Sequence, residues 1–246
     1  MTPDPSIRPP YRFYGRRFGK KLRARQAWLM ANRLPALTML PAGEGAAVID
    51  PRRRFDKNYD QIWLEIGFGG GEHLIAQAAS HPNTGLIGCE PFVNGMAKAV
   101  AEMDRQGLTN IRFHPEDARP LLERLRPASI DRVFLLYPDP WPKKRHHQRR
   151  FVSQENLDLL ARVMKPGAEL RFATDIPDYV TWTLAHMRRR EDFSWTAARA
   201  DDWRTRPADW PASLGATRYE IKAQAAGRVP AYLTFRRTPV PDPERS

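Results

Sequence analysis

Cysteine is almost absent from this chain, which has a single one, Cys89, in 246 residues. One thiol excludes an internal disulfide and any zinc site built on several cysteines. Cys89 stands in a strand-like run, so we expect a small core side chain and not a nucleophile. His146 and His147 are adjacent and point apart, which makes them a poor metal pair. No metal site is predicted there or at the remaining histidines, which have no carboxylate or cysteine partner at ligand spacing: His73, His81, His114 and His186.

Long apolar runs are absent too. No stretch approaches the roughly 18 apolar residues of a membrane-spanning helix. The first residues, Met1-Thr2-Pro3-Asp4-Pro5, lack the apolar segment of a signal peptide. There is no internal repeat, and the ends of the chain alone are of low complexity. These absences predict a cytoplasmic protein that does not associate with membranes.

Acidic residues are outnumbered, with 28 Asp and Glu against 40 Lys and Arg, for a net charge of +12. Such an excess predicts attraction to polyanions, nucleic acid first. An anionic membrane is the weaker candidate, because no basic helix has a wide apolar face. Residues 11–25 contain no acid and alternate basic side chains with aromatic ones, the pattern that grips unpaired RNA. Packing of these aromatics onto the chain's own domain is the alternative.

The length fits one large domain with extensions better than two domains. We expect a basic, partly disordered and RNA-contacting N-terminal extension over residues 1–60, a main domain over 61–237 and a flexible tail over 238–246. Strand and helix signals alternate in the main domain, which predicts a parallel sheet with helices on both faces. The expected strands are 61–66, 84–90, 110–115, 130–137 and 168–174, and the expected helices are 71–80, 93–106, 118–125, 153–164 and 177–190.

Two further strand-like runs, 217–224 and 229–236, break this alternation near the C-terminus. They meet around Ala226-Gly227, so we expect an antiparallel hairpin that closes the sheet. The predicted fold is therefore α/β, with a mostly parallel seven-stranded sheet and a C-terminal antiparallel hairpin. Within the helix at 93–106, Met96, Val100 and Met103 recur at helical spacing, which is typical of a core-facing stripe.

The most informative motif is Glu65-Ile66-Gly67-Phe68-Gly69-Gly70-Gly71, between the first strand and the first helix of the main domain. Glu90 ends the next strand, and a glycine turn with such an acid is how α/β folds hold a nucleoside. Glu72 replaces the last glycine of a G-x-G-x-x-G dinucleotide fingerprint, and its carboxylate repels a pyrophosphate. Glu65 suits a ligand with an amino group. These features favour S-adenosylmethionine over NAD, and so methyl transfer over hydride transfer.

A second motif, Tyr137-Pro138-Asp139-Pro140-Trp141, follows a buried-strand pattern at 131–136. In open α/β sheets ligands bind at the carboxyl ends of the strands. A proline-locked turn at that edge would hold a carboxylate and an aromatic ring at the cofactor's methyl group. The basic run from Lys143 to Arg150 would supply cations beside the site. A solvated surface loop is the alternative reading of that run.

Three more carboxylates are candidates for the site. Asp117 ends the third strand, where methyltransferases usually contact the adenine amine, and capping of the next helix is its alternative role. Asp175 ends the strand at 168–174 and has a similar alternative. Glu220 lies in Thr217-Arg218-Tyr219-Glu220, where pairing on the hairpin surface is the default explanation.

At this point the motifs resemble those of the bacterial tRNA (guanine-N7)-methyltransferases, which are class I methyltransferases with a Rossmann-like fold. The resemblance is carried by 65–74, 138–146, Thr174-Asp175 and 217–220, with Gly15-Arg16-Arg17 in the N-terminal arm, and it runs from about residue 11 to 236. It implies methyl transfer from S-adenosylmethionine to N7 of the variable-loop guanosine at tRNA position 46, leaving S-adenosylhomocysteine. It implies no obligatory partner subunit, and either a monomer or a homodimer.

The resemblance also implies roles for residues by motif position. The cofactor site would consist of Glu65, Gly67, Gly69, Gly71, Glu90, Asp117 and Asp139, with Asp139 at the reaction centre. The guanosine would be contacted by Lys143, Asp175, Thr217, Arg218, Tyr219 and Glu220. The RNA would be contacted by Arg145, His146, His147, Gln148, Arg149 and Arg150, and by Arg16 and Arg17 of the arm. Gln148 departs from the family, which usually has a basic residue there, so one phosphate contact would be weaker.

Other functions stay open at this stage. One is a class I methyltransferase for another RNA base or for protein, although exocyclic-amine methylation usually goes with an Asn/Asp-Pro-Pro-aromatic motif that this chain lacks. Another is a non-catalytic RNA-binding protein with a methyltransferase fold, against which the intact glycine turn and Glu90 argue. A nicotinamide dehydrogenase is disfavoured by Glu72.

Overall fold

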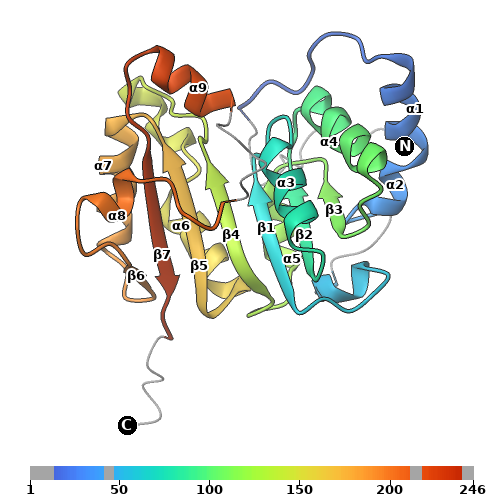
Figure 1. Ribbon diagram of the computed structural model, residues 1–246. Helices are drawn as coiled ribbons and strands as arrows, with labels where there is room; N and C mark the ends of the chain where they lie inside the picture. The colour runs from blue at the N-terminus through green and yellow to red at the C-terminus, as the bar shows by residue number, and fades with distance from the viewer. Residues whose placement is uncertain (1–13, 42–46, 211–217, 240–246) are drawn as a thin grey trace, which may run out of the picture.

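The computed structural model describes residues 14–41, 47–210 and 218–239. Within these ranges one sheet has the strand order β3-β2-β1-β4-β5-β7-β6 (Figure 1). The strands β1 to β5 are parallel, whereas β7 runs antiparallel to β5 and β6. The predicted mostly parallel, seven-stranded sheet is confirmed. The strands are β1 (Gln61–Ile66), β2 (Thr84–Cys89), β3 (Ile111–His114), β4 (Ile130–Leu136), β5 (Met164–Thr174), β6 (Phe193–Trp195) and β7 (Ala231–Arg237).

Helices cover both faces of this sheet, as Figure 1 shows. One face is packed by α1 (Ala24–Asn32), α2 (Leu34–Leu37), α3 (Glu72–Ser80) and α4 (Val93–Gln106). The other is packed by α5 (Ala118–Arg124), α6 (Gln154–Val163) and α7 (Pro177–Met187). The described residues also form α8 (Asp201–Arg204), α9 (Arg218–Ala225) and the 3₁₀ helices η1 (Pro51–Arg54) and η2 (Lys144–Arg149).

The strands are apolar along almost their whole length because both faces of the sheet are covered. In β1, Trp63 points to the core under α3 and α4, while Ile62 and Leu64 point to the core under α5 and α6. The predicted core stripe of α4 is confirmed, since Met96, Val100 and Met103 are all buried. Cys89 is buried in β2, as expected of a core side chain. In the part of the chain that the structure describes, no helix combines the length and apolarity needed to cross a membrane.

The C-terminal end of the sheet differs from the prediction. Residues 218–225 form helix α9 and not a strand, so the expected hairpin of 217–224 with 229–236 is wrong. Glu220 and Ala223 are buried three residues apart while Ile221 is 56% exposed, which is helical spacing and not strand alternation. At the edge of the sheet, β7 pairs instead with β6, and α8 and α9 lie between these two strands in the sequence. Thr217 lies outside the described residues.

The N-terminal arm contains a helix that the sequence pattern did not predict. Helix α1 begins within the basic stretch and packs along α4 through Leu29. Arg25 forms an ion pair of 2.9 Å with Asp104 at the other end of the same contact. Before α1, the backbone of the arm follows the N-terminus of α4, where the amide of Val93 donates to the carbonyl of Arg17 over 2.9 Å. The arm therefore reaches the edge of the sheet where β2 ends.

Candidate active site

The glycine turn joins β1 to α3 at the carboxyl edge of the sheet. Gly67, Gly69 and Gly71 all have positive φ, between 58° and 84°. At Gly71, the N-cap of α3, a Cβ would also lie 2.7 Å from that of Ala99 in α4. Gly95, also in α4, faces the carbonyl oxygen of Gly69, and any side chain there would collide with it. The turn and the start of α4 thus pack closely against each other, with no room for a side chain at Gly71 or Gly95.

Glu65 lies at the end of β1 and is 3% exposed. Its Oε2 is 2.8 Å from Nδ1 of His73 on α3. The sequence spacing indicated no carboxylate partner for His73, and the structure shows that it has one. His73 lies in the first turn of α3, and the helix packs so that the imidazole contacts Glu65 of β1. The histidine does not form a metal cluster, since no group of three or more potential ligands exists among the described residues.

Glu90 follows β2 and accepts hydrogen bonds from the backbone amides of Gly69, at 2.7 Å, and Phe92, at 2.8 Å. Its carboxylate therefore ties the glycine turn to the start of α4. Burial raises the pKa of Glu90; the two amide bonds oppose this shift, and the charges of Asp139 and Glu65 add to it. Glu65 is in register with Gly88 of β2 and Phe134 of β4, so Glu90 and Asp139, which follow those two strands, lie at the same edge.

Asp117 caps α5 by accepting from the backbone amide of Arg119 over 2.9 Å, so the alternative role considered for it is confirmed. The Arg119 guanidinium also pairs with this carboxylate at 2.8 Å. Burial alone would raise the pKa of Asp117, but the hydrogen bonds from Arg119 outweigh burial and the pKa is lowered. Asp117 is therefore a fixed anion at the end of β3.

The Pro-Asp-Pro-Trp turn follows β4, next to β1, and its backbone is strained. Tyr137 has φ 51° and Trp141 has φ 42°, values that are uncommon for residues with side chains and that concentrate at functional sites. Asp139 lies between them, exposed at the surface of the turn, and within the described chain it makes no hydrogen bond or ion pair. Partial desolvation by the surrounding turn still raises the pKa of Asp139. Its carboxylate is available to a ligand.

The arm and this turn meet in a stack of aromatic and cationic side chains. The guanidinium of Arg149 lies 4.5 Å from the ring centre of Tyr14 and 5.0 Å from that of Trp141. The two rings are themselves in edge contact at 6.2 Å. Five residues after Tyr14, the amide of Gly19 donates to the side chain of Asn94 in α4 at 2.6 Å. For Tyr14, packing onto the chain's own domain is therefore what the structure shows.

Some side chains of the basic run 143–150 are exposed, whereas Arg150 is buried and holds neighbouring segments together. Lys143, Arg145 and Gln148 are exposed on or beside η2. Arg150, in contrast, is 2% exposed and lies over the rings of Tyr179 and Trp182 in α7. It donates to the carbonyl of Pro140 at 2.8 Å and forms an ion pair with Asp178, whose carboxylate also lies 3.6 Å from Nε2 of His147. Arg150 therefore anchors the Pro-Asp-Pro-Trp turn to α7, and its burial does not suit direct contact with RNA.

The carboxylates expected to contact guanosine lie where β5, β7 and α9 meet. Asp175 follows β5 and pairs with Arg228 at 2.7 Å. Glu220 of α9 is 3% exposed and accepts from the hydroxyl of Tyr232 in β7 at 2.6 Å. Arg218 and Tyr219 belong to the same helix. Sequence reasoning missed Tyr232 and Arg228, because nothing in their local pattern distinguishes them from ordinary strand and turn residues.

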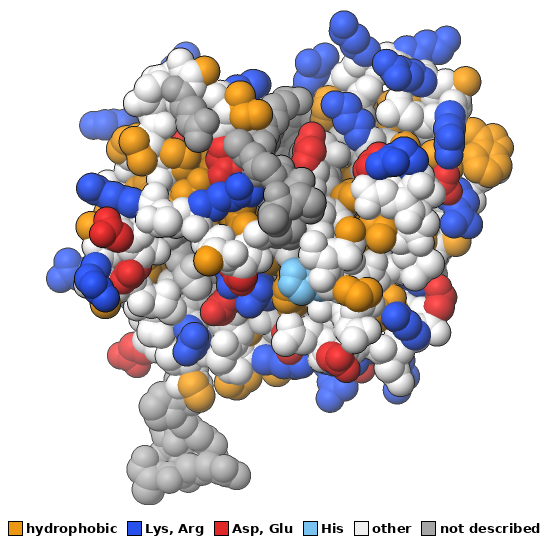
Figure 2. Space-filling model, in the orientation of Figure 1, with side chains coloured by type: hydrophobic (Ala, Val, Ile, Leu, Met, Phe, Trp, Pro, Cys, Tyr) orange, Lys and Arg blue, Asp and Glu red, His pale blue; other side chains and the backbone are white. Residues whose placement is uncertain are grey.

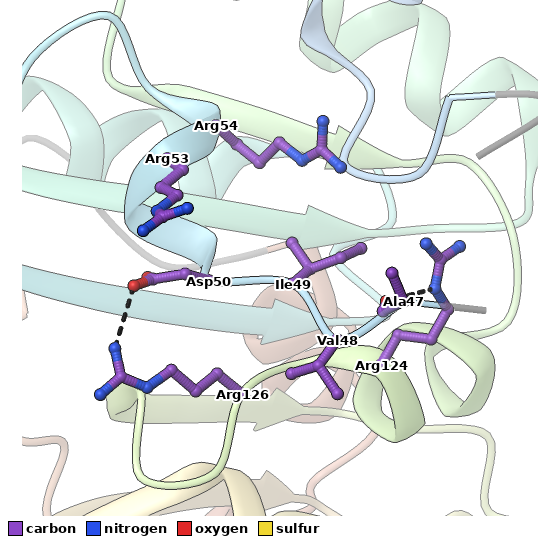
Figure 3. A pocket seen from close by; sticks show the side chains of 8 residues that line it. All are labelled: Ala47, Val48, Ile49, Asp50, Arg53, Arg54, Arg124 and Arg126. Carbon is purple, nitrogen blue, oxygen red and sulfur yellow. Dashed lines mark hydrogen bonds and ion pairs between the residues drawn. The ribbon is translucent and has the colours of Figure 1, made fainter. Parts of the chain in front are cut away.

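The described structure also has a cavity away from this edge of the sheet. Its volume is about 410 Å³, and it is lined by residues 47–50 and by Arg53, Arg54, Arg124 and Arg126 (Figure 3). These residues precede β1 and β4, so the cavity opens at the amino ends of the strands. Asp50 already pairs with Arg126 there at 3.1 Å. This cavity is basic, but the carboxylates and the glycine turn lie at the opposite edge of the sheet.

Basic side chains gather on the visible face of the molecule over the arm, α1 and α4 (Figure 2). This region borders the edge of the sheet that carries the carboxylates, since α4 starts next to Glu90. Basic side chains of the arm, α1 and α4 therefore lie next to the carboxylates at the edge of the sheet. A cationic ligand suits the carboxylates, and a polyanion suits the basic surface beside them.

Comparisons with known proteins agree with this geometry. A family model described as a putative methyltransferase matches residues 59–232. A tRNA (guanine-N(7)-)-methyltransferase from Rhodospirillum rubrum is 53% identical over 93% of this chain and 88% of its own length. Another from Azorhizobium caulinodans is 55% identical over 92% and 94%. The crystal structure of the 16S rRNA methyltransferase KamB, 19% identical, covers 74% of this chain and 89% of its own with a TM-score of 0.54, which supports the fold alone. The chain belongs to the family of the tRNA (guanine-N(7)-)-methyltransferases.

Proposed function

We propose that this protein transfers a methyl group from S-adenosylmethionine to N7 of a guanosine in tRNA, at position 46 of the variable loop. The observation that carries the proposal is the group of three carboxylates, Glu65, Glu90 and Asp139, beside a glycine turn at the point where the sheet reverses its strand order between β1 and β4. Such a switch point is where open α/β sheets bind ligands. The membership in the family gives the reaction class.

The residues present fit S-adenosylmethionine. Its ammonium and sulfonium groups are cationic, and the mutual repulsion of the buried carboxylates favours a ligand that brings positive charge. Glu90 still has lone pairs for ribose hydroxyls, because each carboxylate oxygen accepts more than the one amide it holds. Asp117, fixed at the end of β3, suits the adenine amine. When bound, S-adenosylmethionine supplies an electrophilic methyl group.

The chain's own residues have mainly to orient the base. N7 of guanine carries an in-plane lone pair, so no proton needs to be removed before attack. Alignment of N7 with the methyl group can contribute ~7–11 kcal/mol. Asp139 is the carboxylate we expect to accept from the N1–H and amino edge of guanine, because it has no partner within the described chain. Its negative charge also favours the positive charge that develops on the purine.

Asp175 is the second candidate for the guanine edge. It is held by Arg228, so it can bind guanine only by sharing or exchanging that ion pair. Glu220 is similarly held by Tyr232. Arg145 and the arm residues Arg16 and Arg17 are exposed and suit the phosphates of the RNA, while the exposed Lys143 is kept as a contact to the guanosine. The proposal places the reaction in the cytoplasm and needs no second type of subunit.

The proposal is tested with purified protein, unmodified tRNA and S-adenosylmethionine labelled in its methyl group, followed by digestion of the tRNA to nucleosides. We expect label in N7-methylguanosine, and none when the position-46 guanosine is replaced. Label in another nucleoside would retain the cofactor but discard the reaction. The variant Asp139→Ala is the catalytic control, and normal methylation by it would overturn the role given to Asp139.

A further inference from the structure

Three buried polar side chains form a line behind β1. Oε2 of Glu65 lies 2.8 Å from Nδ1 of His73, and Nε2 of His73 lies 3.0 Å from Nε2 of Gln77. The three residues are 3%, 4% and 1% exposed. His73 and Gln77 are four residues apart on α3, so they share the face of the helix that covers β1. This line is the one place in the described core where a histidine joins a carboxylate of the candidate site.

The direction of these hydrogen bonds follows from the groups involved. An ionised carboxylate only accepts, so Nδ1 of His73 carries the proton that is donated to Glu65. The amide nitrogen of Gln77 only donates, so Nε2 of His73 is the acceptor. The N–H at Nδ1 of His73 thus fixes the position of Oε2 of Glu65.

Aromatic rings fix the imidazole in this position. The ring of Phe134 in β4 lies 4.7 Å from that of His73 in an edge contact, and the ring of Trp210 lies 5.1 Å away on a later segment. Rotation of the imidazole would break both hydrogen bonds, and any rotation other than a half turn would also disturb the ring contacts. His73 therefore holds Glu65 in one orientation, with Oε1 left as the oxygen that can accept from a ligand.

We propose that His73 is a positioning residue that aims the Glu65 carboxylate at the ammonium group of an amino-acid moiety in the bound ligand. The inference rests on the proposed function, in which that moiety is the methionine part of S-adenosylmethionine. It adds a residue for which neither the glycine motif nor the comparisons give a role. The role is one of orientation, because His73 itself does not reach the ligand.

Two ligands separate this role from a merely structural one. S-adenosylhomocysteine and 5′-methylthioadenosine share the adenosine and the sulfur, but only the first has the ammonium group. If His73 positions Glu65, its hydrogen bond affects the first ligand and not the second. If His73 only fills space, its loss affects both ligands alike.

Two substitutions separate the hydrogen bond from the packing. His73→Phe keeps a ring between Phe134 and Trp210 but has no N–H, whereas His73→Asn loses the ring and keeps an N–H close to the place of Nδ1. We expect His73→Phe to weaken S-adenosylhomocysteine about tenfold, as for one oriented hydrogen bond to a charge, with 5′-methylthioadenosine unchanged. We expect His73→Asn to bind both ligands within about threefold of the wild type. Calorimetric titration measures all the affinities.

Equal weakening of both ligands, or no change in either, would overturn the inference, as would a larger loss for His73→Asn than for His73→Phe. If the wild-type protein binds neither ligand, the cofactor assignment fails and the inference with it. If His73→Phe does not fold, His73→Leu replaces it, and the comparison of the two ligands remains decisive.

Discussion

At the scale of single residues, carboxylates at one edge of the sheet behave in opposite ways. Burial raises the pKa of Glu90 and partial desolvation raises that of Asp139, whereas Arg119 lowers that of Asp117. The difference lies in the partner, because Asp117 has a cation beside it and the other two do not. A cationic ligand would therefore gain most from Glu90 and Asp139 in their ionised forms.

This gives a pH prediction for cofactor binding. Ionised Glu90 is the form that holds both backbone amides and still accepts from ribose hydroxyls, and its pKa lies above the ordinary value of 4.5. The affinity for S-adenosylhomocysteine should therefore fall as the pH is lowered, beginning above the range in which exposed glutamates titrate. Calorimetric titration over a pH series measures this. An affinity that stays constant until ordinary glutamates protonate would contradict it.

A second residue-scale prediction separates Arg150 from its neighbours. Arg150→Ala removes a buried guanidinium that bonds Pro140 and packs on two rings, so it should lower the free energy of unfolding by roughly 2–3 kcal/mol. The exposed Arg145→Ala should change that free energy by less than about 0.5 kcal/mol while weakening tRNA binding. Denaturant unfolding and filter binding measure the two effects. Unchanged stability in Arg150→Ala would refute its structural role.

At the scale of elements, residues 14–20 of the arm are held beside the site at three places. One is the stack of Tyr14, Arg149 and Trp141, and another is the backbone bond from Val93 to Arg17. The third is Asn94, which accepts from the amide of Gly19 and donates to the carbonyl of Lys20, both at 2.6 Å. All three contacts border the candidate site. The arm is therefore held in a fixed course beside the cofactor residues, with its basic side chains outward.

Removing the two hydrogen bonds of Asn94 should make the arm more mobile without disturbing the core. Asn94→Ala removes both bonds to the arm, so we expect faster amide hydrogen exchange over residues 14–20 and tRNA binding weakened about three- to tenfold. Asn32→Ala is the matched control, because Asn32 bonds only the carbonyl of Trp28 in its own helix. Equal effects of the two substitutions on tRNA binding would show that the course of the arm is irrelevant.

At the scale of the whole molecule, the net charge of +12 acts on the RNA and not on the cofactor. Raising the salt concentration should therefore weaken tRNA binding steeply, by on the order of 10³ from 50 to 200 mM if about six phosphates are contacted. Binding of S-adenosylhomocysteine should change little, because its partners are buried carboxylates. Fluorescence anisotropy across a salt series measures both.

The position of the cations can be tested in the same assay. Arg145→Ala at the carboxyl edge of the sheet should reduce the logarithmic salt slope by about one contact. Arg53→Ala, in the basic cavity at the opposite edge, should leave it unchanged. A reduced slope for Arg53→Ala would mean that the tRNA extends around the molecule to that edge.

Much of the fold was determined by the sequence through local pattern. Alternating apolar strands and amphipathic helices predicted the parallel sheet, and chain direction alone then brings Glu65, Glu90, Asp117 and Asp139 to one edge. The turn at Gly67, Gly69 and Gly71 was likewise predicted from residue type, and the structure adds that all three have positive φ. These features could be predicted because they depend on neighbours in the chain and on the common direction of parallel strands.

Only the tertiary structure decided the features that depend on distant neighbours. Residues 218–225 alternate like a strand, but burial of Glu220 against Tyr232 and of Ala223 makes them a helix. Arg150 reads as one more surface cation, yet α7 buries it. The spacing along the chain gives His73 no carboxylate partner, and Glu65 becomes one when α3 folds back over β1. The physical reason is that burial and hydrogen bonding across elements outweigh local propensity, and neither is written in the spacing of residues along the chain.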